Sequence, residues 1–245
     1  FDRFSNAYQT ELVAMYEAWS AETLRLASLE HATGPSIRDM VGARLDQLGI
    51  EMKMLGRRRI SEASGLGLGR LLGGRASSPA IINTVARLIA QNDAFIDTSL
   101  IPDLKLKLGA DLVNARQVIP DPALRREAMK ATLVGPKARV ASYSGGAVAA
   151  IFETQRVAGA EENSERKAKG EQPIAVRWRL DPTAEHCEDD PSRGTFGCPS
   201  LAREYAAGWD ALPTVPAGNV SCMGNCRCEL EFDLHDGKGW RRLDV

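Results

Sequence analysis

The spacing of apolar residues changes at Gly170, and this change constrains the fold more than any other feature of the chain. Before it, apolar residues recur every three or four positions, as in amphipathic helices. After it, "IAVRWRL" at 174–180 and "ELEFDL" at 229–234 alternate apolar with charged residues, as half-buried strands do. We predict a mainly α chain with a small C-terminal α+β module. Residues 1–170 form the helical region, and residues 171–245 form a short antiparallel sheet with a cysteine cluster.

Glycine and proline divide the first part of the chain into helices. Helical patterns cover 5–32, 36–48, 78–96, a short stretch after Pro122, and 144–169. Ser36 followed by Asp39 resembles a capping box, and Ser78 followed by Pro79 is a typical helix start. The segment "DLKLKLG" alternates Leu with Lys, which fits either a short strand or the beginning of a helix.

The stretch at 56–78 is rich in Gly and Arg. Gly65, Gly67 and Gly69 do not continue into a Gly-x-Gly-x-x-Gly pattern, no strand precedes them, and no Gly-Lys-Ser/Thr follows. A nucleotide-binding loop is therefore not indicated. We predict a flexible or irregular loop, and a loop that touches DNA or a neighbouring subunit is the alternative.

Charge is unevenly distributed. Residues 53–139 carry 15 Lys and Arg against 7 Asp and Glu, whereas residues 171–245 carry 8 against 13. A solvated face is the ordinary explanation, and proximity to phosphates or to an acidic partner is the alternative. No apolar run reaches the ~18 residues of a membrane span, and the first residues lack the order of a signal peptide. We expect cytoplasmic origin and no membrane contact. Because the sequence begins at Phe1, we expect a further segment before it.

All five cysteines lie in the last quarter of the chain: Cys187, Cys198, Cys222, Cys226 and Cys228. The exposed faces of the two predicted strands carry opposite charges, which favours antiparallel pairing. Such pairing brings the residues after the first strand beside those before the second. Four thiolates gathered there suit a structural, tetrahedral Zn²⁺. The best set is Cys187, Cys198 and Cys228 with one of Cys222 or Cys226.

Other chemistries stay open at this point. The spacing differs from common zinc motifs, since ten residues separate Cys187 from Cys198. Disulfides and reduced buried cysteines are the alternatives. His186 is a substitute ligand, but neighbours in extended backbone point to opposite sides, so we interpret it as a bystander.

Enzymatic chemistry is not favoured by the sequence. A catalytic thiol needs a base, and the histidines of the chain are His31, His186 and His235. A zinc-dependent hydrolase would need an open coordination position and a carboxylate base such as Glu188, yet no His-Glu-x-x-His pattern is present. We expect no enzymatic activity.

Four segments between residues 144 and 234 together resemble a known family. They are "IFETQRVAGAEENSERKAKG", "VRWRLDPTAEHCEDD", "GWDALPTVP" and "NCRCELEF". Their order resembles the C-terminal domain of tailed-phage minor head proteins, the head-morphogenesis family typified by the Mu protein F-like domain. The chain departs from the family's Cys-x-x-Cys after the strand, because Asp190 occupies the second position and Cys198 follows later. Cys222 lies near the place where many relatives have His.

The resemblance implies a non-enzymatic structural protein of a bacteriophage virion. It would be a portal-associated minor head protein of the phage head interior or portal vertex, present in the host cytoplasm during assembly. It would act in head morphogenesis and in DNA packaging or ejection. Its partners would be the portal protein and other head (capsid) proteins, with packaged DNA facing the basic 53–139 region. A nucleic-acid-binding zinc module and a zinc-dependent hydrolase are the alternatives.

Overall fold

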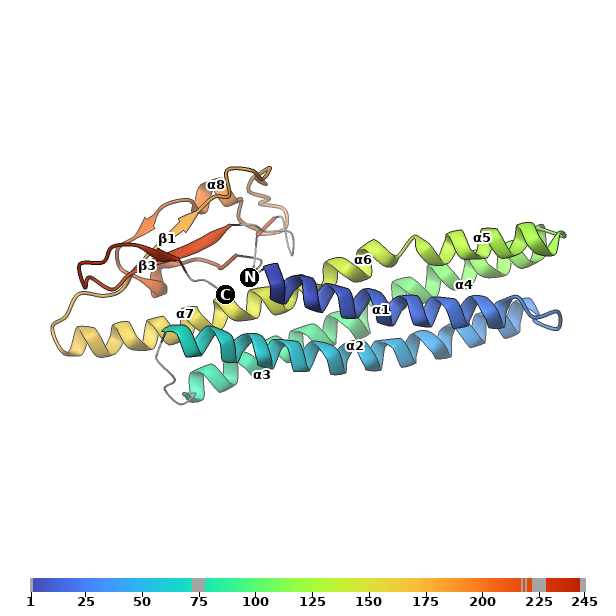
Figure 1. Cartoon of the computed structure of the whole chain (residues 1–245), viewed down its shortest axis with the longest axis horizontal. Helices are drawn as coiled ribbons and strands as arrows, with labels where there is room; N and C mark the ends of the chain where they lie inside the picture. Colours follow the sequence, from blue (N-terminus) through green and yellow to red (C-terminus); the bar gives the residue numbers. More distant parts are fainter. Residues whose placement is uncertain (1, 72–77, 217, 219, 222–227, 243–245) are drawn as a thin grey trace. The chain divides into compact units, whose positions relative to one another are not determined.

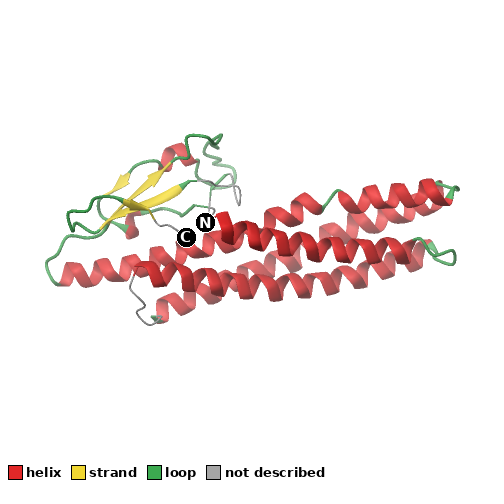
Figure 2. Cartoon of the chain, viewed as in Figure 1, coloured by secondary structure: helices red, strands yellow, loops and turns green. Residues whose placement is uncertain are grey.

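Helices dominate the fold, and a small four-stranded sheet follows them in the chain (Figures 1 and 2). The computed structural model describes residues 2–71, 78–216, 218, 220–221 and 228–242. The predicted fold class, mainly α with a short C-terminal antiparallel sheet, is confirmed. None of the described helices has the length and apolar composition that crossing a bilayer requires.

The elements follow one another in a simple order. The helices are α1 (Asp2–Ala27), α2 (Gly34–Leu71), α3 (Pro79–Phe95), α4 (Ile101–Val118), α5 (Pro122–Val134), α6 (Lys137–Ala141), α7 (Gly145–Ala168) and the short α8 (Cys198–Leu201). The strands are β1 (Ala175–Arg179), β2 (Glu204–Tyr205), β3 (Glu229–Asp233) and β4 (Arg241–Arg242). They pair in the order β2-β1-β3-β4, with all neighbours antiparallel.

The chain forms two compact units. The helical unit consists of Asn6–Arg58 and Ala90–Tyr143, and the sheet unit contains the remaining described residues. The sheet unit therefore includes the end of α2, most of α3, and α7 together with the sheet. The expected boundary at residue 170 falls inside this unit, and independent folding of 171–245 stays a prediction.

Close helix contacts hold the helical unit together. Gly49 of α2 lies against Ile101 of α4, where a Cβ on the glycine would be 3.0 Å from Ile101 Cγ1. The buried Tyr16 hydroxyl donates to the Leu133 carbonyl at 2.7 Å, and Trp19 Nε1 donates to the Arg44 carbonyl at 2.9 Å. Burial raises the pKa of Tyr16, so this hydroxyl stays a hydrogen-bond donor.

The loop predicted over 56–78 is wrong for residues 56–71, which continue α2 as a helix. Ile60, Ala63 and Ser64 of this stretch are buried, and Thr154 of α7 donates to the Ser64 hydroxyl at 3.2 Å. Each glycine costs a helix about 1 kcal/mol relative to alanine. Packing against α7 offsets that cost. Residues 72–77 lie outside the described part.

The structure also shows how α2 and α3 begin and that the segment "DLKLKLG" is helical. The capping box of α2 begins at Thr33 and not at Ser36. The Thr33 N–H donates to the Ser36 hydroxyl at 2.8 Å, and the Ser36 N–H donates to the Thr33 hydroxyl at 3.3 Å. Ser78 caps α3 as predicted, accepting from the Ile81 N–H at 3.2 Å. "DLKLKLG" lies inside α4, with Leu104 and Leu108 buried.

The predicted pairing of the two long strands is confirmed, with Arg177 opposite Glu231 and Arg179 opposite Glu229. The expectation that the acidic face of β3 is exposed is wrong for Glu231, which is 3% exposed. Both arginines donate to its carboxylate, Arg179 at 2.9 Å. Burial by itself would raise the pKa of Glu231, but these hydrogen bonds outweigh it and hold the pKa below its ordinary value.

Helix α7 supports the sheet through two close contacts. Asn163 accepts from the Ile174 N–H at 2.7 Å and donates to the Ile174 carbonyl at 3.3 Å, which fixes the entry into β1. The buried Trp209 ring packs against Gly159, where a Cβ would lie 2.3 Å from Trp209 Cδ1. No side chain larger than hydrogen fits at Gly159 without moving this ring.

Most of the basic residues at 53–139 are paired with carboxylates. Of the 13 whose side chains the structure describes, nine form ion pairs: Lys53, Arg57, Arg58, Arg59, Lys105, Lys107, Lys130, Lys137 and Arg139. Several of the partners, such as Glu11, Glu17 and Asp46, come from outside this range. Because the other partners belong to the seven acidic residues already counted in the range, the outside carboxylates offset only three of the eight excess positive charges.

Candidate metal centre

A β-hairpin explains the long spacing between the first two cysteines. Asp190 and Thr195 form an antiparallel bridge, with hydrogen bonds in both directions at 3.0 and 3.1 Å. Residues 191–194 make the turn, and Gly194 has a positive φ of 64°. At the open end of the hairpin, the Cys198 N–H donates to the Cys187 carbonyl at 3.2 Å. The ten intervening residues thus bring the two cysteines opposite each other.

The sulfurs of the hairpin cysteines are close. Cys187 Sγ and Cys198 Sγ are 3.7 Å apart. Cys198 is the first residue of α8 and is 2% exposed, while Cys187 is half-buried. No disulfide joins the cysteines that the structure describes.

Cys228 lies near the hairpin cysteines and comes from the segment before β3. It directly precedes β3, whose first residue, Glu229, pairs with the last residue of β1, Arg179. The chain after β1 and the chain before β3 therefore meet, as the antiparallel pairing predicts. Cys228 is 3% exposed, so its thiol lies in the protein interior.

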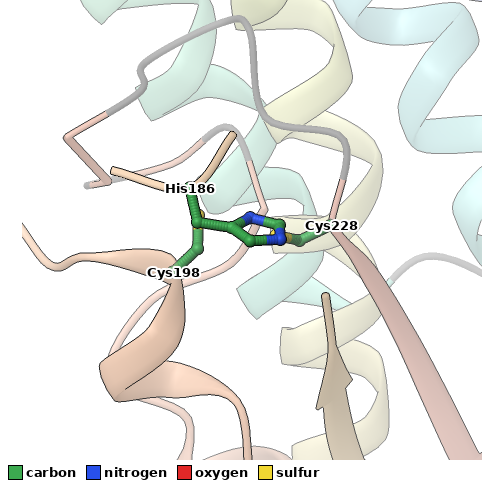
Figure 3. A group of neighbouring side chains, drawn as sticks. All are labelled: His186, Cys198 and Cys228. Atoms are coloured by element: carbon green, nitrogen blue, oxygen red, sulfur yellow. The ribbon is translucent and has the colours of Figure 1, made fainter. Parts of the chain in front are cut away.

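His186 completes a group that could hold a metal ion. One ring nitrogen of His186, Cys198 Sγ and Cys228 Sγ all lie within 4.8 Å of one another, and the imidazole ring extends from the hairpin toward Cys228 (Figure 3). The structure thus brings His186, interpreted from the sequence as a bystander, into the group that could hold a metal. That interpretation assumed extended backbone, whereas residues 185–189 form neither strand nor helix. The signal in the sequence was a histidine directly beside a cysteine.

The remaining cysteines and histidines considered as ligands or bases lie at different places in the chain. Cys187 lies beside Cys198, as described above, and Cys222 and Cys226 lie outside the described residues. His31 lies in the turn between α1 and α2, and His235 follows β3 at the end opposite Cys228. Neither belongs to the group of described residues that could hold a metal ion.

Asp189 and Gly197 hold the two arms of the hairpin together near the thiols. The Asp189 carboxylate accepts from the Gly197 N–H at 2.6 Å and from the Ser200 hydroxyl at 2.8 Å. The Gly197 bond and then the Ser200 bond hold the pKa of Asp189 below its ordinary value. A Cβ at Gly197 would lie 2.6 Å from the Asp189 nitrogen, so only glycine permits this approach.

The donor set decides which ions suit the site. Thiolate and imidazole are soft or borderline ligands, which favour zinc and disfavour magnesium or calcium. The ligands come from a hairpin and from the start of a strand, so a bound ion would tie two segments that are far apart in the sequence. This arrangement fits a metal that stabilises a fold.

Comparison of the chain with protein-family models, with curated proteins and with solved structures gives no match. The functional conclusion therefore depends on the residues and on their geometry.

Proposed function

We propose that this chain is a structural minor head protein of a tailed bacteriophage, associated with the portal and needed for head assembly and DNA packaging or ejection. The observation that carries the proposal is the resemblance of the four segments between residues 144 and 234. Three of them contribute α7, β1 and β3 to the sheet unit, and one contributes the Trp209 turn that packs on α7. The segments thus belong to one packed structure, which supports treating them as parts of one domain.

The metal in this proposal is a structural Zn²⁺. The edge strands β2 and β4 have only two residues each, so few backbone hydrogen bonds hold the edges of the sheet, and a bound metal would add a further link. Thiolates and an imidazole gathered between the hairpin and β3 supply ligands of the type that structural zinc uses. Zinc would hold the hairpin against the sheet.

The same arrangement supports a role without catalysis. The histidine that lies near the thiols is His186, which itself belongs to the cluster and is therefore a poor candidate for a catalytic base. Glu188, the carboxylate base that a zinc-dependent hydrolase would need, is exposed. For the nucleic-acid-binding alternative, carboxylates already pair with nine of the basic side chains at 53–139, although a positive excess remains there.

The experiment is mass spectrometry of purified proheads and virions induced from the genome that carries the coding sequence. We expect the polypeptide in a few copies per particle, and in the fraction that contains the portal after the heads are disrupted. Deletion of the coding sequence should reduce the yield of filled heads. Complete, infectious particles that lack the polypeptide would rule the proposal out.

A further inference from the structure

We infer that Cys187 completes a closed four-ligand zinc site with His186, Cys198 and Cys228. The inference rests on the structural zinc proposed above and names the side chains that hold it. It changes the set expected from the sequence, because a histidine takes the place given there to a cysteine of the 222–226 segment.

The distance between two sulfurs is the first argument. Two sulfurs bound to one tetrahedral Zn²⁺ at ~2.3 Å lie about 3.8 Å apart, because a tetrahedron's edge is about 1.6 times its centre-to-vertex distance. Cys187 Sγ and Cys198 Sγ are 3.7 Å apart, far longer than the ~2.0 Å of a disulfide bond. The pair is spaced like two ligands of one ion.

The position of Cys198 Sγ is the second argument. This sulfur lies 3.7 Å from Cys187 Sγ and within 4.8 Å of both a His186 ring nitrogen and Cys228 Sγ. Cys198 Sγ is therefore close to each of the other three donors. Cys187 itself is not in the group whose donors all lie within 4.8 Å of one another, so the Cys187 side chain has to turn toward His186 and Cys228 when the site closes on an ion. The irregular backbone at 185–189 lets both side chains face Cys198.

The supporting structure is the third argument. The Asp190–Thr195 bridge and the Asp189 carboxylate hold the hairpin arms that carry Cys187 and Cys198, and sheet pairing fixes the start of β3 after Cys228. A metal site needs neighbouring hydrogen bonds of this kind, because they hold the ligand side chains in position.

The number of donors has two consequences. A structural zinc site is closed by four protein ligands, so one imidazole and three thiolates leave no open position for a catalytic water. They also leave Cys222 and Cys226 without a role as ligands. Replacing both should therefore not affect zinc binding.

The wild-type protein gives the first test. The zinc-loaded chain is treated with N-ethylmaleimide, and mass spectrometry follows the modification of each cysteine, with and without prior treatment with EDTA. We expect zinc to slow modification of Cys187, which is half-buried, and to leave Cys222 and Cys226 reactive. Rapid modification of Cys187 in the zinc-loaded protein, or zinc-dependent protection of Cys222 or Cys226, would overturn the inference.

Variants titrated with Co²⁺ give the second test, because the thiolate-to-cobalt absorption band grows with the number of bound thiolates. The double variant Cys222→Ser, Cys226→Ser should keep the wild-type band and affinity. Cys187→Ser should lose part of the band and more than about tenfold in affinity, whereas His186→Cys should gain intensity. An unchanged spectrum in Cys187→Ser, or loss of binding in the double variant, would contradict the inference.

The outcomes separate the two proposals. A wild-type chain that binds neither Zn²⁺ nor Co²⁺ would overturn both the structural zinc and this ligand set. A chain that binds one ion through other thiols would overturn the ligand set alone. The presence of the polypeptide in phage particles is measured independently of both.

Discussion

Single residues near the thiols determine whether the hairpin can close. Gly197 is buried and lies so near the opposite arm that a Cβ would be 2.6 Å from the Asp189 nitrogen and 2.8 Å from the Cys187 oxygen. Both are backbone atoms, which cannot turn aside as the end of a flexible side chain can. The spacing of Cys187 and Cys198 therefore depends on the absence of a side chain at this position.

We predict that Gly197→Ala separates the hairpin arms and weakens zinc retention. The measure is the concentration of a competing chelator that removes half of the zinc, which should fall several-fold. Gly42→Ala in α2 is the control, because a Cβ at Gly42 meets nothing within 4 Å. Equal zinc retention in the two variants would show that the hairpin geometry does not position the ligands.

Glu231 gives a prediction about pH. Because the folded-state pKa lies below the ordinary value, the ionised Glu231 stabilises the fold above about pH 4.5, and this contribution is lost as the pH falls through the folded-state pKa. Glu231→Gln should lower the free energy of unfolding by about 1–3 kcal/mol at pH 7. The difference from wild type should shrink in acid.

Urea unfolding of both proteins at pH 7 and pH 4 measures this difference. The control is Glu229→Gln, since Glu229 is half-exposed and its ion pair with Arg242 is 3.4 Å long, so an effect within about 1 kcal/mol is expected. A Glu231→Gln deficit that is the same at both pH values would contradict the argument from the pKa.

At the scale of elements, the end of α2 gives a test that separates helix from loop. Gly65 is exposed, helical and free of neighbours around its missing Cβ. We predict that Gly65→Ala raises the free energy of unfolding by about 0.5–1 kcal/mol, as expected for glycine in a helix. Gly170→Ala is the opposite control, because its φ of 74° strains any larger residue. No gain from Gly65→Ala would favour an irregular segment there.

The elements also show how far the sequence predicts the fold. Periodicity identified both long strands and the helices at 5–32, 36–48, 78–96 and 144–169, because burial of one face imposes a regular spacing. It left α4 undecided between strand and helix. It missed the helix at 56–71, since the packing of Ile60 and Ser64 that outweighs the glycines involves residues distant in sequence. It also missed the hairpin between Cys187 and Cys198, whose turn residues were read only as a long gap between ligands. The sequence also did not predict that His186 lies among the thiols, because its neighbours in the group, Cys198 and Cys228, are distant in sequence.

At the scale of the whole molecule, the ion pairs made by the basic side chains at 53–139 bear on the choice of partner. Lys53 and Arg57 pair with Asp97 and Asp93, and Lys105 pairs with Asp46. We therefore predict weak binding to double-stranded DNA, with little dependence on salt, in fluorescence anisotropy between 50 and 200 mM salt. Tight binding that falls about 10³-fold or more over this range would indicate many phosphate contacts and would favour the nucleic-acid-binding alternative.

The central claim is that a metal closes the C-terminal part of the chain while the helical unit folds without it. Limited proteolysis of the zinc-loaded protein, before and after removal of the metal with a chelator, tests it most directly. We expect removal to expose cleavage sites in residues 171–245, and Cys228→Ser to do the same without a chelator, while fragments of the helical unit stay resistant. A tail that resists protease equally well with and without metal would contradict the account.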